Sequence, residues 1–188
     1  ILGGTLVTVA AIGAVIVASK LSKINTVKLD TDKLSVSKEA KKRGSGYLNV
    51  ALFGVDSRDN DLDKGTRSDT IMIASLNKKT MKVKIASIYR DTLSEQEDGT
   101  LNKINAAYSY GGPEGALSVL NKNLDMNIEH YVTVNFNSMI DIVDSVGGID
   151  IDVQEDEVPY ICGYVQEIMK VTGKLSPGVT EPGTQTLN

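Results

Sequence analysis

The 188 residues include one cysteine, one histidine and no tryptophan. A lone Cys162 excludes a disulfide within the chain, and therefore a small scaffold held together by disulfides. A Ser–His–Asp hydrolase would have to use His130, and the chain has no G-x-S-x-G segment to present a nucleophile. The spacing of dinucleotide-binding and P-loop motifs is also missing. The glycines of Gly111-Gly112-Pro113-Glu114-Gly115 suit the start of a helix better.

Positive charge is scarce in most of the chain. Residues 47–188 contain twelve Lys or Arg against twenty-one Asp or Glu, whereas residues 20–46 contain eight against three. An acidic domain repels the phosphate backbone of nucleic acids, so we expect no nucleic-acid partner.

The first 19 residues contain neither a charged residue nor a proline. About 18 apolar residues are near the shortest length that spans a bilayer, so residues 1–19 are predicted to form a transmembrane signal-anchor. A signal-peptide core or a buried helix is the alternative. The basic, serine-rich residues 20–46 are predicted to be a polar linker, and residues 47–188 the folded domain.

Strand and helix patterns alternate within the predicted domain. Nearly continuous apolar sequence at 48–55 predicts a strand that is buried on both faces. Two more strands, at 70–76 and 82–88, are joined by a short turn at 77–80. A helix is expected from Pro113, with Ala116, Leu117, Leu120 and Leu124 on its apolar face.

The second half of the domain continues this alternation. We expect a strand at 130–136 and a helix at 138–146 with Met139, Val143 and Val146 facing inward. A strand with one wet face follows at 149–153, and no regular element is expected after Val171. The predicted fold class is therefore α/β, with a mixed central sheet flanked by helices and preceded by the transmembrane helix.

Aspartate and arginine gather in three polar segments, namely Asp56-Ser57-Arg58, Arg67-Ser68-Asp69-Thr70 and Tyr89-Arg90-Asp91-Thr92. A tight turn at 77–80 would place Asp69 opposite residues 88–90. If the strands at 48–55 and 82–88 run in the same direction, Asp56 reaches the same edge of the sheet, where α/β folds bind ligands.

Such a cluster could handle a phosphate. Two carboxylates, Asp56 and Asp69, can hold magnesium while phosphate oxygens and water complete its coordination. The guanidinium groups of Arg58, Arg67 and Arg90 can bind diphosphate oxygens, and together with the metal they would stabilise a transferring phosphoryl group. The same side chains could instead form ordinary loop ion pairs, such as Arg90 with Asp91.

The chain resembles the LytR–CpsA–Psr family of cell-wall proteins, with segments that match the family pattern in the same order over about residues 47–153. The matching segments are Asn49-Val50-Ala51-Leu52-Phe53-Gly54-Val55-Asp56-Ser57-Arg58, Arg67-Ser68-Asp69-Thr70, Ser87-Ile88-Tyr89-Arg90-Asp91-Thr92, Lys103-Ile104-Asn105-Ala106-Ala107-Tyr108 with Gly111-Gly112, His130-Tyr131, and Val146-Gly147-Gly148-Ile149-Asp150-Ile151.

The resemblance implies a membrane-anchored transferase whose domain lies on the extracytoplasmic face of the cell membrane. It implies transfer of an anionic glycopolymer, of teichoic acid or capsule type, from a polyprenyl diphosphate carrier to a muramic acid hydroxyl of peptidoglycan. It also implies an apolar tunnel for the polyprenyl tail. The residues that match its site are the magnesium-associated Asp56 and Asp69, the diphosphate-contacting Arg58, Arg67 and Arg90, and a site-ordering Asp91.

The chain departs from the family pattern in two places. Tyr89 stands where the family usually has proline. The family has further arginines and a glutamine after the point that matches residues 183–188, so we expect the carboxyl-terminal part of the domain to be missing here. Two other functions therefore stay open: a regulator that binds polyprenyl phosphate without turnover, and a lipid diphosphate hydrolase.

Overall fold

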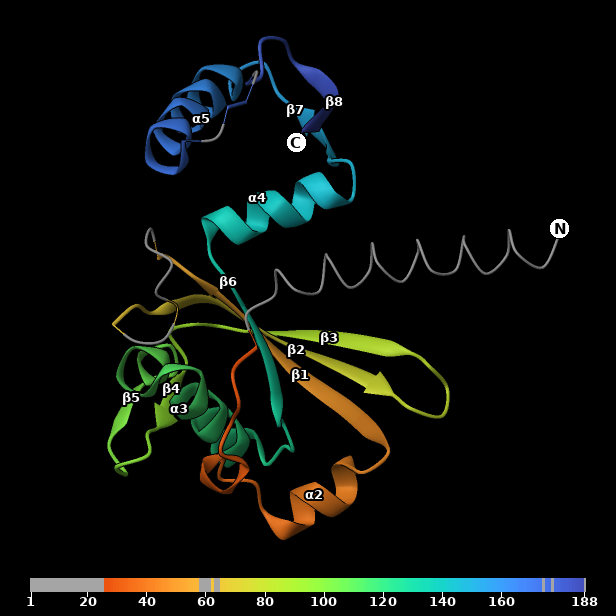
Figure 1. Ribbon diagram of the computed structural model, residues 1–188, viewed down its shortest axis with the longest axis vertical. Coiled ribbons are helices and arrows are strands. Elements are labelled where there is room, and N and C mark those ends of the chain that lie inside the picture. Colours follow the sequence, from red (N-terminus) through yellow and green to blue (C-terminus); the bar gives the residue numbers. More distant parts are fainter. Residues whose placement is uncertain (1–25, 58–61, 63–64, 174, 177, 188) are drawn as a thin grey trace, which may run out of the picture.

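The computed structural model describes residues 26–57, 62, 65–173, 175–176 and 178–187. The elements of these residues are drawn in Figure 1. In chain order they are η1 (Thr31–Lys33), α2 (Lys38–Gly44), β1 (Tyr47–Val55), β2 (Ser68–Asn77), β3 (Val83–Ile88), β4 (Leu93–Glu95), β5 (Leu101–Lys103), α3 (Ala106–Leu124), β6 (His130–Val134), α4 (Phe136–Ser145), β7 (Ile149–Val153), α5 (Val158–Thr172) and β8 (Gly183–Leu187).

The central sheet has four strands in the order β3-β2-β1-β6. Strand β2 runs antiparallel to both β1 and β3, whereas β6 runs parallel to β1. The predicted turn between β2 and β3 is confirmed: the side-chain oxygen of Asn77 accepts hydrogen bonds from the backbone N–H groups of Lys79 and Thr80. This asparagine turn sets the pairing of Ile71 with Ile88 further along the hairpin. The expected α/β fold with a mixed sheet is confirmed.

One face of the sheet packs against α3. Alternate residues of β1, among them Ala51 and Phe53, are buried beside Leu117 and Leu120 of the helix. The ring of Phe53 meets that of Tyr108 edge to face, with centroids 5.2 Å apart. The intervening residues of β1 are only half-buried. The expectation that this strand is buried on both faces is therefore correct for the face toward α3 and wrong for the opposite face.

Helix α3 begins at Ala106, ahead of the expected start at Pro113. Gly112 interrupts it with a φ of 62° and a ψ of −154°, a conformation essentially restricted to glycine, and Pro113 opens the second segment. The glycines and proline therefore mark a kink between two helical segments. The predicted apolar face is confirmed at Ala116, Leu117 and Leu120, which are buried, and is wrong at Leu124, which is 39% exposed at the end of the helix.

Residues 26–46, which belong to the predicted polar linker, fold onto the domain. Leu34 is fully buried in the core, and its carbonyl accepts a hydrogen bond from the amide of Asn121. Arg43 forms an ion pair with Asp125 at the end of α3. The predicted anchor at 1–19 lies outside the described residues. Among the residues that are described, no helix is long and apolar enough to cross a membrane.

The elements after β6 differ most from expectation. Helix α4 has no buried residue, and Met139 and Val146 are 47% and 70% exposed, so the prediction that they face inward is wrong. Gly147 and Gly148, both with positive φ, follow the end of this helix. Strand β7 is confirmed, but its partner β8 and the helix α5 were not predicted.

The kink of α3 gives a test of the fold. Replacing Gly112 with alanine forces a Cβ into a backbone region that L residues avoid, and we expect the free energy of unfolding to fall by about 1–3 kcal/mol. Denaturant unfolding measures this change. Gly46→Ala is the matched control, because nothing lies within 4 Å of a Cβ built at that exposed glycine. Equal stability of the two variants would contradict the kinked conformation.

Candidate functional site

The described residues of the three predicted polar segments lie at one edge of the central sheet. Because β2 is antiparallel to both of its neighbours, β1 and β3 end where β2 begins (Figure 1). Asp56 directly follows β1, Asp69 is the second residue of β2, and Arg90 lies two residues after the end of β3. The expectation that the exits of β1 and β3 open at one edge is confirmed. These two strands are not neighbours, however, since β2 lies between them.

A β-bulge presents Asp69 at this edge. Gly54 pairs with Thr70 and Val55 pairs with Ser68, so Asp69 is an extra residue with no partner on β1. A bulge of this kind re-aims side chains at the end of a strand. Ser68 is fully buried, whereas the side chain of Asp69 is 47% exposed and accepts a hydrogen bond from Nη1 of Arg90 at 2.5 Å. The contact joins two of the predicted site residues.

Asp91 extends this ion pair into a network. Its carboxylate lies 3.7 Å from Nε of Arg90 and 2.5 Å from Nζ of Lys103. The hydrogen bond from Lys103 is the main cause that lowers the pKa of Asp91, and the charges of Lys103, Arg90 and Arg67 add to it. Arg67 therefore acts on the same cluster. Lys103 was not predicted as a site residue, although it lies in a segment that carries the family resemblance.

Backbone hydrogen bonds hold the turn that carries Arg90 and Asp91. The N–H and hydroxyl groups of Thr92 both donate to the carbonyl of Tyr89, at 3.0 and 2.7 Å. The carbonyl of Arg90 accepts from the N–H of Asn105 at 3.2 Å, just ahead of α3. Tyr89, which replaces the proline usual in the family, is 88% exposed and leaves this turn intact.

Two buried polar atoms beside the turn are unsatisfied. Within the described part of the chain, Oγ of Ser68 and Oδ1 of Asn105 have no hydrogen-bond partner, although both residues are at least 96% buried. Ser68 precedes Asp69, and Asn105 holds the carbonyl of Arg90. Unsatisfied buried polar groups are rare in folded proteins, and these two lie directly beside residues of the predicted site.

The donor set suits a magnesium ion that shares its coordination with substrate. Asp56 is exposed directly after β1, and its carbonyl accepts a hydrogen bond from Thr66, which joins the two ends of the intervening loop. No group of three or more His, Cys, Asp or Glu that could hold a metal occurs among the described residues. Two aspartates fit magnesium, which retains water and takes phosphate oxygens. Arg58 lies outside the described residues.

A sequence model of the LytR_cpsA_psr family matches residues 12–188 of this chain. A relative from Bacillus cereus strain AH820 is named polyisoprenyl-teichoic acid–peptidoglycan teichoic acid transferase TagU. It is 39% identical over 126 residues, which are 66% of this chain and 40% of that protein. The chain therefore spans well under two thirds of the length of this relative.

Solved structures share the fold. The LytR-CPS2A-psr family protein YwtF (TagT) with bound octaprenyl pyrophosphate lipid aligns with 87% of this chain and 57% of its own, at a TM-score of 0.55 and 26% identity. A structure of TagT bound to LIIa-WTA aligns with 87% of this chain and 54% of its own, at a TM-score of 0.55 and 25% identity.

The ion pair between Lys103 and Asp91 predicts a titration. In Lys103→Gln the carboxylate loses its main stabilising partner, so we expect the pKa of Asp91 to rise toward its ordinary value. Because the folded-state pKa is lowered, ionised Asp91 stabilises the wild-type fold above its unfolded-state pKa. That contribution is lost as pH falls through the folded-state pKa.

Carboxyl-carbon NMR titration of Asp91 measures this shift. Lys84→Gln is the matched control, because Lys84 is an exposed lysine of β3 that has no ion pair among the described residues. The ion pair would be refuted by an Asp91 titration curve that is the same in wild type and Lys103→Gln.

Proposed function

The chain belongs to the LytR–CpsA–Psr family, and from that premise we propose that the protein transfers an anionic glycopolymer from a polyprenyl diphosphate carrier to peptidoglycan. The contact between Asp69 and Arg90 at the sheet edge carries this proposal. It sets a phosphate-binding guanidinium beside a carboxylate that suits magnesium, at the edge where α/β sheets bind ligands. The name of the Bacillus cereus relative supports teichoic acid as the polymer and peptidoglycan as the acceptor.

Positive charge at the edge suits a diphosphate. Arg67, Arg90 and Lys103 all act on Asp91, and the side chain of Arg90 is 53% exposed although it pairs with Asp69. A guanidinium has five N–H donors, so Arg90 keeps donors for phosphate oxygens while it contacts the carboxylate. Asp91 is a weak base because its pKa is lowered, and this favours a role in positioning Arg90 and Lys103.

The sheet face opposite α3 suits an apolar tail. On this face Leu52 pairs with Met72 and Val132, and Ala74 pairs with Ile85. Val132 and Ile85 are 49% and 63% exposed. This face begins at the edge that carries Asp69, so a diphosphate at the edge could extend a hydrocarbon chain along it. The octaprenyl pyrophosphate bound in the YwtF structure supports this assignment.

The proposed reaction is a phosphoryl transfer. The hydroxyl of the acceptor sugar attacks the phosphorus that carries the glycopolymer, the bridging P–O bond breaks, and polyprenyl phosphate leaves. The proton of the hydroxyl passes to a base near the phosphorus. Arg90 and Arg67 would neutralise charge on the phosphate oxygens. Asp56 and Asp69 would hold magnesium, which supplies further charge neutralisation when bound.

We further propose that the domain works on the extracytoplasmic face of the cell membrane, tethered by residues 1–19. A carrier lipid and a peptidoglycan acceptor both favour that place. Lys20 and Lys23, which directly follow the predicted anchor in the sequence, would lie close to anionic lipid headgroups.

Replacing Asp69 with alanine tests the catalytic site. We expect transfer of labelled lipid-linked polymer to peptidoglycan oligomers to fall by at least about 100-fold, because Arg90 loses its partner and magnesium loses a ligand. Omitting magnesium should have an effect in the same direction. Asp144→Ala, on exposed α4, is the matched control and should keep wild-type activity.

The same assay separates the two alternatives. Lipid binding without turnover in the wild-type protein would contradict a transferase and favour the regulator. Free phosphorylated polymer as the only product would favour the hydrolase. If Asp144→Ala lost as much transfer activity as Asp69→Ala, the result would contradict a specific role of the sheet edge in the reaction.

Arg90→Lys separates phosphate binding from folding. A lysine keeps the charge but lacks the planar fork, so we expect turnover to fall by roughly tenfold or more while affinity for the lipid tail changes little. Steady-state transfer rates and lipid binding are measured on the same preparation. Equal losses in both would show that Arg90 holds the fold.

A further inference from the structure

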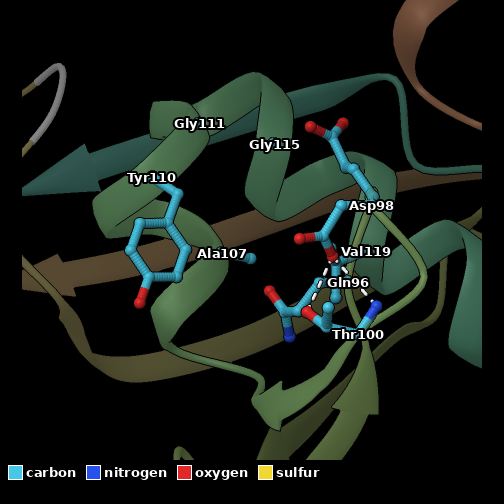
Figure 2. Close-up of a pocket in the computed structure, with 9 residues that line it drawn as sticks. Gln96, Asp98, Thr100, Ala107, Tyr110, Gly111, Gly115 and Val119 are labelled. Carbon is cyan, nitrogen blue, oxygen red and sulfur yellow. Dashed lines mark hydrogen bonds between the residues drawn. The ribbon is translucent and has the colours of Figure 1, made fainter.

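A pocket of about 210 Å³ lies between the β4–β5 hairpin and helix α3 (Figure 2). It is separate from the contact between Asp69 and Arg90, and none of the residues proposed above for the transfer reaction lines it. The helix side of the pocket contains the kink near Gly112 and the exposed ring of Tyr110. The hairpin side contributes the polar residues Gln96, Glu97, Asp98 and Thr100.

Gln96 is a buried side chain with an unused acceptor. It is 6% exposed, and its amide nitrogen donates to Oγ of Ser94 at 3.0 Å and to the carbonyls of Ser94 and Lys103. Its amide oxygen accepts no hydrogen bond from any residue that the structure describes. Because Gln96 lines the pocket, as Figure 2 shows, this oxygen is available to a donor there.

Two carboxylates add to this acceptor. The Oε2 atom of Glu97 lies 3.8 and 3.9 Å from the positions that a Cβ would take on Gly111 and Gly115, so it rests against the glycine face of α3. Glu97 forms no ion pair with any described residue. Oδ1 of Asp98 accepts from the N–H and hydroxyl groups of Thr100, at 2.9 and 2.7 Å. Its second oxygen has no such partner within the described part of the chain.

The lining therefore offers acceptors and negative charge. Among the described residues, no lysine or arginine lines the pocket. The nearby Lys122 is paired with Glu95 at 2.8 Å, and its charge also acts on Asp98. Tyr110 lines the pocket and is 68% exposed, and the face of an aromatic ring attracts cations. A primary ammonium has three N–H donors and one positive charge, and so matches an amide oxygen, two carboxylates and an aromatic ring.

We propose that this pocket binds a primary ammonium group of the cell-wall substrate. The assignment of the ligand to the cell wall rests on the proposed function. The hairpin that forms the pocket has the ion pair of Asp91 with Lys103 at its base, and β4 begins two residues after Asp91. Three strand residues span roughly 10 Å, so a substrate at the sheet edge could place an amino group at the hairpin tip.

Two substrates could carry the ammonium group, and binding experiments separate them. The first probe is a peptidoglycan fragment with a free amino group on its peptide, compared with the same fragment acetylated at that amine. The second is a glycopolymer fragment with and without its amino groups. Dissociation constants are measured by calorimetry for the wild-type protein and for Glu97→Gln, Asp98→Asn and Glu155→Gln. Thermal melts confirm that each variant is folded.

We expect acetylation and Glu97→Gln each to weaken binding of the amine-bearing peptidoglycan fragment by at least about tenfold, since each removes a charged hydrogen bond. Asp98→Asn should act in the same direction. Glu155→Gln, at an exposed acidic residue outside the pocket, should bind as the wild type does. Amine dependence with the glycopolymer fragment alone would assign the pocket to that substrate.

Equal affinity for amine-bearing and blocked forms of both probes would overturn the proposal, as would wild-type affinity in both Glu97→Gln and Asp98→Asn. Binding of a prenyl diphosphate is measured in parallel, and Glu97→Gln should leave it unchanged. A wild-type protein that binds amines but no prenyl diphosphate would contradict the proposed transferase and leave the ammonium pocket standing. The two failures are therefore distinguishable.

Discussion

The register of β2 against its two neighbours is the constraint on which the candidate site depends. Pairing of Ile71 with Ile88 brings Asp69 level with Arg90 beyond the end of β3, and the bulge beside Val55 frees Asp69 from the ladder. A slip of one residue would move every side chain of β2 to the opposite face and separate the ion pair. The asparagine turn at Asn77 holds this register from the far end of the hairpin.

The hairpin could be predicted from the sequence because its turn residues and apolar runs are local signals. Counting residues outward from this turn on both strands places Asp69 opposite Arg90, as the structure has it. Lys103 could not be found in this way, since its partner Asp91 is reached only when the β4–β5 hairpin folds back. Likewise, the composition around Leu34 indicates a linker, and only the tertiary packing shows that this leucine is buried.

Periodicity was least informative after β6. A repeat of apolar residues shows which side chains share a face of a helix, but it does not show what covers that face. Met139 and Val146 share such a pattern and are exposed in the described part of the chain. Strand β8 has leucine as its one large apolar residue, which gives no apolar alternation to read from the sequence, and it forms by pairing with β7. Strand β8 thus depends on a partner about 30 residues earlier in the sequence, which no local pattern reveals.

The account predicts that a diphosphate binds at the edge where β1 and β3 end. NMR amide shifts during titration with a short-chain prenyl diphosphate and magnesium measure this most directly. The largest shifts should fall at residues 54–57, 67–70 and 89–92, and manganese in place of magnesium should broaden the same signals. Shifts confined to α5 and the β7–β8 pair, with residues 67–70 and 89–92 unchanged, would contradict the central claim.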